Sequence, residues 1–267
     1  MKIPFTKAHG ARNDFLLTWR ANAPEDDLPA IARSICDRYT GVGADGWMLV
    51  TPPEDAEADG AIQLYNSDGS SAEISGNGTR CAAAFLIRHS YATGVVRIRT
   101  GAGLKTLRLL KRTDLAFEFE MNMGRAEITA ERLQLLLFTG PRDVTTLRVG
   151  NPQCAVPVKD FDFDWRAMGA EIERHPHFPN RTNVSFIRPV DLHTIDVRFY
   201  ERGASETMSS GTGSTGAAAA AVARGLAQFP VTVLTPAGPL QIRQDADIFL
   251  TGPAEITAIG DFFHARI

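Results

Sequence analysis

Residues 210–219 read SGTGSTGAAA, a glycine-rich turn that leads directly into alanines. The run continues through Ala220, Ala221, Val222 and Ala223 with almost no polar side chain. A helix that is apolar all round belongs inside a domain. The N-terminus of such a helix is polar even when its side chains are apolar. Its free backbone N–H groups and the positive end of the helix dipole attract an anion. The stretch therefore predicts a buried helix whose first turn can bind an anion.

The same pattern occurs a second time, at residues 75–84 (SGNGTRCAAA). Residues 61–84 and 196–219 align without a gap and share 8 of 24 residues. Downstream, residues 96–103 (VRIRTGAG) correspond to 231–238 (VTVLTPAG). Tight packing explains one glycine-rich turn before a small-residue helix, but not a repeat of the whole strand, turn, helix and strand. We infer a duplicated chain of two similar domains, with the two helix starts facing one ligand between them.

Composition excludes several classes of protein. The chain has 267 residues, enough for two domains, with 44% apolar and 22% charged residues. A net charge of −3 argues against nucleic acid as the main partner. No apolar run reaches the ~18 residues that cross a bilayer, and the start carries no secretory apolar region. The three cysteines lack metal-ligand spacing, so we expect a cytoplasmic protein with reduced thiols, no metal and no membrane partner.

Strand and helix patterns alternate along the chain, which predicts an α/β fold. Residues 26–39 carry apolar side chains at helical spacing, and residues 115–121 alternate as a strand does. We place the first domain at 1–120 and the second at 121–254, and we expect the strand-like tail 255–267 to return to the first domain.

Two common nucleotide motifs can be set aside. Gly211, Gly213 and Gly216 form a GxGxxG pattern, but the acidic residue expected ~20 positions later is absent. The first copy has Cys81 in place of the third glycine. No lysine follows the glycines, which excludes a phosphate-binding P-loop.

Two long signatures resemble those of the diaminopimelate epimerase family: residues 66–81 (NSDGSSAEISGNGTRC) and 201–213 (ERGASETMSSGTG). Shorter matches follow the same order along the whole chain, at residues 9–15, 43–45, 150–152 and 183–184. The resemblance implies two pseudo-symmetric domains, each a β-barrel-like, mostly antiparallel sheet wrapped around a central helix. It also implies a cofactor-independent epimerase whose site lies between the domains.

The resemblance also implies a site and a reaction. In this family one acid/base residue precedes each glycine turn, and the two act on opposite faces of the α-carbon of an amino diacid. That reaction converts LL- to meso-diaminopimelate, a precursor of lysine and peptidoglycan. The two positions correspond here to Ser75 and Ser210.

The substrate-binding residues carried over by the resemblance fall into three groups. Backbone N–H groups at the helix starts would bind the α-carboxylate: Gly76, Asn77, Gly211 and Thr212. The distal carboxylate would be bound by Asn66, Asn151, Asn183 and Arg202. Glu201 and the Arg202 carbonyl would take the distal ammonium, and Asn13 would line the same cleft. A bidentate arginine suits a carboxylate ligand.

Serine at both acid/base positions departs from the family, which has cysteine there. A thiol ionises near pH ~8.5, and a helix N-terminus lowers that value, whereas an alkanol hydroxyl is far less acidic. Removing an α-proton with serine needs an adjacent base. Arg12, Gly46 and Gln153 also depart from the family pattern. Such surrounding changes favour natural divergence over an engineered pair of serines.

Three other residues are candidates for a substitute base. Cys81 and Cys154 are more consistent with buried core positions, and Asp68 follows the end of a predicted strand.

Three functions therefore stay open. The first is a diaminopimelate epimerase-like isomerase, and the second is a dehydratase or other isomerase of the same superfamily that uses one face only. The third is an amino-diacid-binding paralogue that has lost its chemistry. The partner in each case is a small molecule, and a homodimer is left open.

Overall fold

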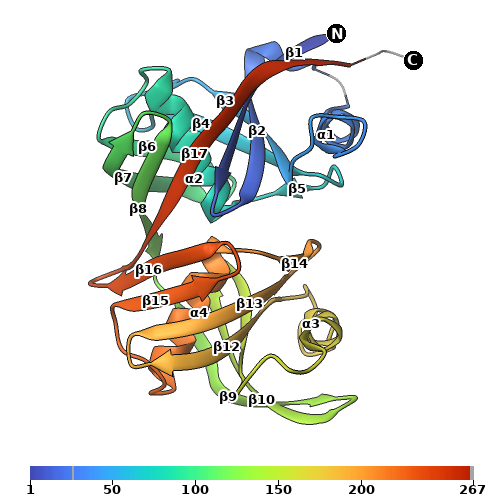
Figure 1. The fold of residues 1–267 in the computed structure, drawn as a ribbon, viewed down its shortest axis with the longest axis vertical. Coiled ribbons are helices and arrows are strands. Elements are labelled where there is room, and N and C mark those ends of the chain that lie inside the picture. The colour runs from blue at the N-terminus through green and yellow to red at the C-terminus, as the bar shows by residue number, and fades with distance from the viewer. Residues whose placement is uncertain (26, 265–267) are drawn as a thin grey trace. The chain divides into compact units, whose positions relative to one another are not determined.

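The computed structural model describes residues 1–25 and 27–264. The chain forms two compact units, Met1–Met121 with Gly252–Ile267 and Asn122–Thr251 (Figure 1). The chain leaves the first unit along strand β8 (Ala116–Gly124) and returns along strand β17 (Ile248–Phe263).

The first unit is a sheet closed around helix α2 (Gly76–Arg88). Neighbouring strands follow the order β17, β1, β2, β3, β4, β6, β7 and β8, and β8 pairs again with β17. In this ring β2–β3 and β4–β6 pair in parallel, whereas β1–β17, β1–β2, β3–β4, β6–β7 and β7–β8 are antiparallel. The remaining elements are β1 (Lys2–Gly10), β2 (Asn13–Trp19), the 3-10 turn η1 (Arg20–Asn22), α1 (Leu28–Cys36), β3 (Gly46–Thr51), β4 (Gly60–Asn66), β5 (Ser71–Ala72), β6 (Val95–Thr100) and β7 (Gly103–Thr113).

The second unit repeats this order of elements around helix α4 (Gly211–Ala223). Its strands run β9, β10, β11, β12, β13, β15, β16 and β17, with β11–β12 and β13–β15 parallel. Helix α4 contacts strands β9–β13, β15 and β16. The elements are β9 (Glu127–Leu137), β10 (Gly140–Val149), β11 (Asn151–Pro157), α3 (Trp165–Glu173), β12 (Asn183–Asp191), β13 (Thr194–Glu201), β14 (Ser205–Thr207), β15 (Val231–Thr235) and β16 (Gly238–Gln244). The predicted mixed α/β fold with a barrel-like sheet is confirmed.

Small side chains let the sheets approach the two central helices. Residues 211–221 of α4 are all buried, as the uniformly apolar pattern predicts. A Cβ on Gly78 of α2 would lie 2.6 Å from the end of the Met48 side chain and 3.2 Å from the Phe15 ring, so a larger residue there would displace Met48. Each unit also has a second apolar cluster, under α1 in the first and under α3 in the second.

His9 belongs to β1, where it pairs with Glu255 of β17. The turn that follows β1 is formed by Ala11 and Arg12, both in the left-handed region, with φ of 50° and 59°. Of the predicted returning tail, residues 265–267 lie outside the described part of the chain.

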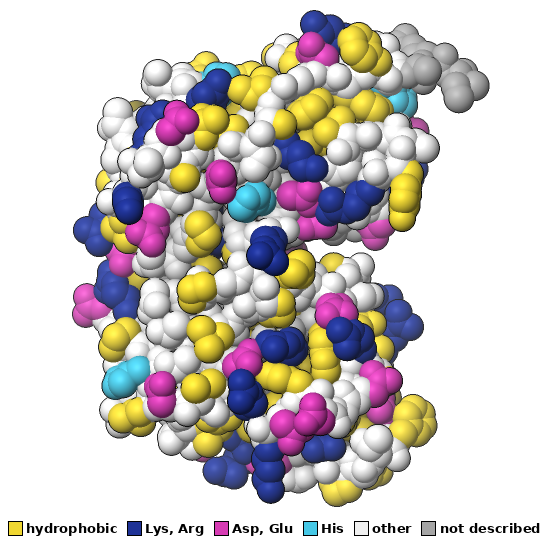
Figure 2. All heavy atoms as spheres, viewed as in Figure 1, with side chains coloured by type: hydrophobic (Ala, Val, Ile, Leu, Met, Phe, Trp, Pro, Cys, Tyr) yellow, Lys and Arg dark blue, Asp and Glu magenta, His cyan; other side chains and the backbone are white. Residues whose placement is uncertain are grey.

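The surface of both units mixes charges of both signs, as Figure 2 shows for one face. Within residues 1–25 and 27–264, no helix combines the length and the apolar character needed to cross a membrane.

Candidate functional site

Ser75 and Ser210 occupy equivalent positions, each at the N-cap of a central helix. The Ser75 Oγ accepts a hydrogen bond from the Gly78 N–H at 3.1 Å. The Ser210 Oγ accepts one from the Gly213 N–H, also at 3.1 Å. Both cap residues have extended backbone, as an N-cap requires. The remaining N–H groups of each first turn are thus the donors that an anion would meet.

Ser210 has a carboxylate beside it. Its hydroxyl donates to Glu201 Oε1 at 2.6 Å, and Ser210 itself is only 3% exposed. The hydroxyl of Thr207 donates to the second carboxylate oxygen at 2.7 Å. Glu201 ends β13 and Thr207 ends β14, and these strands pair with Glu201 opposite Ser205. The hairpin therefore holds the carboxylate against the start of α4.

The other side of the α4 start is built from β11. The Asn151 amide donates to the Thr212 hydroxyl at 3.4 Å, and the Gln153 amide donates to Asn151 Oδ1 at 2.7 Å. Gln153 packs against Gly216 of the helix. Its Oε1 is buried without a hydrogen-bond donor in the described residues. An unpaired buried acceptor of this kind is costly unless a ligand donates to it.

Asn183 and Arg202 form the third part of this half-site. Asn183 Oδ1 accepts from the Arg202 backbone N–H at 3.0 Å, while its amide donates to the Pro152 carbonyl at 3.1 Å. The Arg202 guanidinium is exposed and donates to the Asn180 carbonyl at 3.3 Å. Asn183 thus joins the strand that carries Asn151 to the turn after Glu201. These contacts bring together all the predicted site residues of the second unit.

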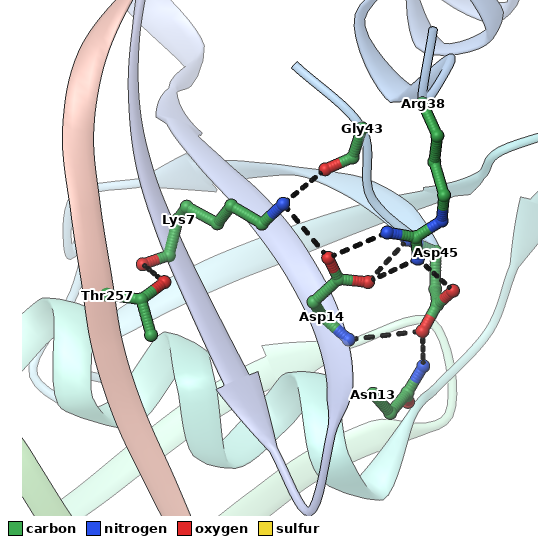
Figure 3. Close-up of polar contacts among 7 residues, drawn as sticks. All are labelled: Lys7, Asn13, Asp14, Arg38, Gly43, Asp45 and Thr257. Carbon is green, nitrogen blue, oxygen red and sulfur yellow. Dashed lines mark hydrogen bonds and ion pairs between the residues drawn. The ribbon is translucent and has the colours of Figure 1, made fainter. Parts of the chain in front are cut away.

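In the first unit, Asn13 and Asn77 meet at the start of α2. The Asn77 amide donates to Asn13 Oδ1 at 3.3 Å, and the Asn13 amide donates to Asp45 Oδ2 at 2.7 Å. Arg38 bridges Asp45 and Asp14, with 2.8 Å to each carboxylate (Figure 3). Two hydrogen bonds between Asp45 and the backbone of Asp14 complete the network. The start of β2, which carries Asn13, is therefore fixed by charge-assisted contacts.

Asp14 stays ionised because two cations face it. Lys7 Nζ lies 3.1 Å from Asp14 Oδ2 and also donates to the Gly43 carbonyl (Figure 3). Burial opposes ionisation of Asp14, but the hydrogen bonds from Arg38 and Lys7 outweigh it and hold the pKa of this carboxyl below its usual value.

Arg80 is buried inside the first turns of α2. Its guanidinium is fully buried and donates to Pro253 O at 3.0 Å, Gly76 O at 3.3 Å and Asn77 Oδ1 at 2.6 Å. No ion pair to Arg80 occurs among the described residues of its unit. Burial lowers its pKa to about 10, which still leaves it charged at neutral pH. A positive charge therefore lies beneath the start of α2.

Asn66 and Asp68 belong to the turn between β4 and β5. The Asn66 amide donates to the Ser70 hydroxyl at 2.9 Å. Hydrogen bonds from the Ser70 hydroxyl and N–H lower the pKa of Asp68. Asp68 is thus held inside its own turn, which argues against its use as the substitute base.

All three cysteines are buried and unpaired, as expected of core residues. Burial raises the pKa of Cys36 and Cys81 to about 12, and burial also raises the pKa of Cys154. Cys36 and Cys154 belong to the two apolar clusters. These thiols are therefore neutral at physiological pH and unsuited to proton abstraction.

Sequence reasoning missed three features of these half-sites: the Ser210–Glu201 contact, the buried Arg80 charge, and the Arg38 network around Asn13. The presence of Glu201 as the first residue of the second signature was a signal for the first of these features. No local pattern distinguishes Arg80 from an exposed helix arginine. Among the described residues no group of three or more His, Cys, Asp or Glu could hold a metal.

Comparison with protein families gives one match that covers most of the chain. The profile described as "Diaminopimelate epimerase" matches residues 5–129 and 145–257. A diaminopimelate epimerase of Halothermothrix orenii is 35% identical over 277 residues, covering 97% of this chain and 98% of the relative. One of Synechococcus elongatus is 38% identical over 273 residues, covering 95% and 96%.

Solved structures with the same fold have much lower sequence identity. A hydroxyproline epimerase of Agrobacterium vitis superposes with a TM-score of 0.76 at 16% identity, covering 97% of this chain and 92% of that one. A phenazine biosynthesis protein of the PhzF family from Bacillus anthracis gives 0.73 at 14%, covering 98% and 99%.

Proposed function

Because this chain belongs to the diaminopimelate epimerase family, we propose that it is an isomerase that moves the α-proton of diaminopimelate or a closely similar amino diacid. Ser75 and Ser210 hold the acid/base positions, and no cofactor takes part. The observation that carries the proposal is the pair of serine-capped starts of α2 and α4, which have the same 3.1 Å cap.

In this proposal the two units are pseudo-symmetric domains, and the two helix starts flank one ligand. The first N–H groups of both helices bind the α-carboxylate: Gly76, Asn77, Gly211 and Thr212. This arrangement stabilises the negative charge that develops when the α-proton leaves, because the donors are already oriented. Asn13 lines the same ligand site.

The distal end of the substrate meets a second set of polar groups. The distal carboxylate is bound by Asn66, Asn151, Asn183 and Arg202. The distal ammonium donates hydrogen bonds to the Glu201 carboxylate and the Arg202 carbonyl. Asn183 accepts a hydrogen bond from the Arg202 backbone N–H and donates one to the carbonyl of Pro152, the residue after Asn151, which supports a shared role for this set. Every proposed contact comes from a single chain, so the proposal does not depend on whether two copies associate. The unpaired thiols suit the reducing cytoplasm in which we place the protein.

Calorimetry with diaminopimelate and with lysine tests this assignment, since lysine lacks the distal carboxylate. Arg202→Ala should weaken diaminopimelate binding by about 1.5–3 kcal/mol, the cost of a lost charge-assisted hydrogen bond, and should change lysine binding little. Arg132→Ala serves as a control, because that exposed arginine lies on β9 and pairs with Asp143. An equal loss of binding free energy for both ligands would show that Arg202 does not bind the distal carboxylate. The absence of any diaminopimelate binding by the unaltered protein would refute the proposed substrate.

A further inference from the structure

We propose that Arg80 is a positioning residue of the half-site at the start of α2. Its buried charge favours a carboxylate there, and its hydrogen bond to Asn77 orients the amides that meet the ligand. Arg80 does not touch the ligand itself, because its side chain is fully buried. This inference rests on the proposed function and adds to it the residue that gives this helix start its preference for an anion.

The three nitrogen atoms of the Arg80 guanidinium each donate to a neutral oxygen of the same unit. Nε donates to the Pro253 carbonyl at 3.0 Å, one terminal nitrogen to the Gly76 carbonyl at 3.3 Å, and the other to Asn77 Oδ1 at 2.6 Å. Neutral oxygens satisfy the N–H groups, but they do not cancel the positive charge. The Gly76 contact places this charge beside the first turn of α2, where the helix dipole already favours an anion.

The second copy of the repeat shows that this contact with the helix turn does not require a charge. Thr215 stands at the position of Arg80, and its hydroxyl donates to the Gly211 carbonyl at 2.9 Å. Gly211 is the equivalent of Gly76, so a neutral side chain makes the same contact in α4. Burying a guanidinium costs far more than burying a hydroxyl. The charge of Arg80 is therefore better explained by anion binding than by support of the turn.

Arg80 also sets the direction of a chain of hydrogen bonds. A guanidinium can only donate, so Asn77 turns its amide oxygen towards Arg80 and its amide nitrogen towards Asn13 Oδ1, at 3.3 Å. The Asn13 amide donates in turn to the Asp45 carboxylate at 2.7 Å, and an ionised carboxylate can only accept (Figure 3). Both amide oxygens are engaged inside this chain, so the two amides offer a ligand N–H donors. A carboxylate, which only accepts, fits such donors.

The other charges of this network are paired with one another. Arg38 bridges Asp14 and Asp45, and Lys7 also pairs with Asp14 (Figure 3). The charges of these two cations and two carboxylates cancel at one end of the chain of hydrogen bonds. Arg80 adds a positive charge at the other end, beside the start of α2.

A thiol at the cap of α2 measures this charge without any substrate. Ser75→Cys supplies the thiol, and the native cysteines do not compete because they are buried and burial raises the pKa of each. Mass spectrometry gives the rates of alkylation by iodoacetate and by iodoacetamide over a range of pH. Iodoacetate carries a carboxylate and iodoacetamide is its neutral amide, so the ratio of the two rates reports the attraction of a carboxylate to this helix start.

In the Ser75→Cys protein, Arg80→Met should lower the ratio of the iodoacetate rate to the iodoacetamide rate by about tenfold. It should also raise the pKa of the introduced thiol by about one unit, because a nearby opposite charge is worth about that much. A lost packing contact would change the access of both reagents alike and leave the ratio unchanged. Arg80→Lys keeps a charge, and its ratio should fall between those of the arginine and methionine proteins.

The matched control is Arg88→Met, which removes an exposed arginine from the last turn of the same helix. It should leave both the ratio and the pKa of the introduced thiol nearly unchanged. Urea unfolding checks that each variant is folded. If Arg80→Met is not folded, Arg80→Gln provides the neutral comparison, because its amide can still donate to a carbonyl.

A ratio and a thiol pKa that the neutral variant leaves unchanged would overturn the inference, as would an equal change in Arg88→Met. Calorimetry on the protein with Ser75 retained gives a second reading. Arg80→Met should weaken diaminopimelate binding by about tenfold, the affinity equivalent of one pKa unit, and unchanged binding would also overturn the inference. The absence of diaminopimelate binding by the unaltered protein would refute the proposed function, whereas the alkylation ratio would still test the charge of Arg80.

Discussion

At the scale of single residues, the chemistry turns on what stands beside each serine. Ser210 is buried, accepts a hydrogen bond from the Gly213 N–H and donates one to Glu201. Ser75 accepts the equivalent hydrogen bond from the Gly78 N–H. The helix dipole contributes roughly 0.3–2 kcal/mol, far too little to ionise an alkanol hydroxyl by itself. Reactivity therefore depends on the carboxylate.

Replacing both serines by cysteine should increase α-proton exchange and inversion of diaminopimelate by about 100-fold or more, because a thiol ionises near neutral pH without a helper. Each single replacement should do less. Ser75→Cys should raise inversion more than Ser210→Cys, since Ser210 already has Glu201 as its partner. The measurement is chiral chromatography with deuterium analysis. Brisk inversion by the unaltered protein, with no gain in the double variant, would contradict this view.

The native thiols should resist alkylation. Cys36, Cys81 and Cys154 are buried, and burial raises the pKa of each. Iodoacetamide at pH 8 should leave the native protein unlabelled and its α-proton exchange unchanged. In denaturant three thiols should react, as mass spectrometry can count. Rapid labelling of the native protein with loss of exchange would identify a cysteine base.

At the scale of elements, the local sequence pattern predicted the helices and turns whose structure depends on residues close together along the chain. The glycine turns, the serine caps and the buried helices α2 and α4 all follow from residues within a few positions of one another. The Ser210–Glu201 contact depends on the register of β13 against β14, which places Thr207 opposite Phe199. The burial of Arg80 depends on Pro253, a residue of β17 far along the chain. Such long-range contacts leave no periodic signal in the sequence.

The Asp14 network gives a stability prediction with a definite pH dependence. Hydrogen bonds from Arg38 and Lys7 lower the pKa of Asp14 despite burial, so its contribution is present above the unfolded value of about 3.9 and is lost as pH falls through the lower folded value. At pH 7, Asp14→Asn should cost about 1.5–3 kcal/mol. Its unfolding free energy, measured in urea, should then decline less than that of the unaltered protein as pH falls below about 4.

The matched control is Glu118→Gln, an exposed carboxylate on β8. It should leave both the unfolding free energy at pH 7 and its decline in acid nearly unchanged. An Asp14→Asn variant that loses stability in acid as steeply as the unaltered protein would show that Asp14 is not part of this dependence.

At the scale of the whole molecule, duplication supplies two half-sites that have diverged. Both units repeat the same order of strands around a serine-capped helix. The sequence predicted this repeat because it survives as a gapless alignment of residues 61–84 with 196–219. The alignment also places Asn66 of the first copy opposite Glu201 of the second. It did not reveal that this carboxylate contacts the Ser210 hydroxyl. We predict that the two half-sites act on one ligand.

The most direct test is a crystal structure of the protein with meso-diaminopimelate bound. We predict that the reacting α-carbon lies between Ser75 Oγ and Ser210 Oγ, at about 3–3.5 Å from each, with the α-carboxylate on the N–H groups of both helix starts. A ligand that contacts only one unit, or serine hydroxyls on separate surfaces beyond the reach of a single α-carbon, would contradict the account.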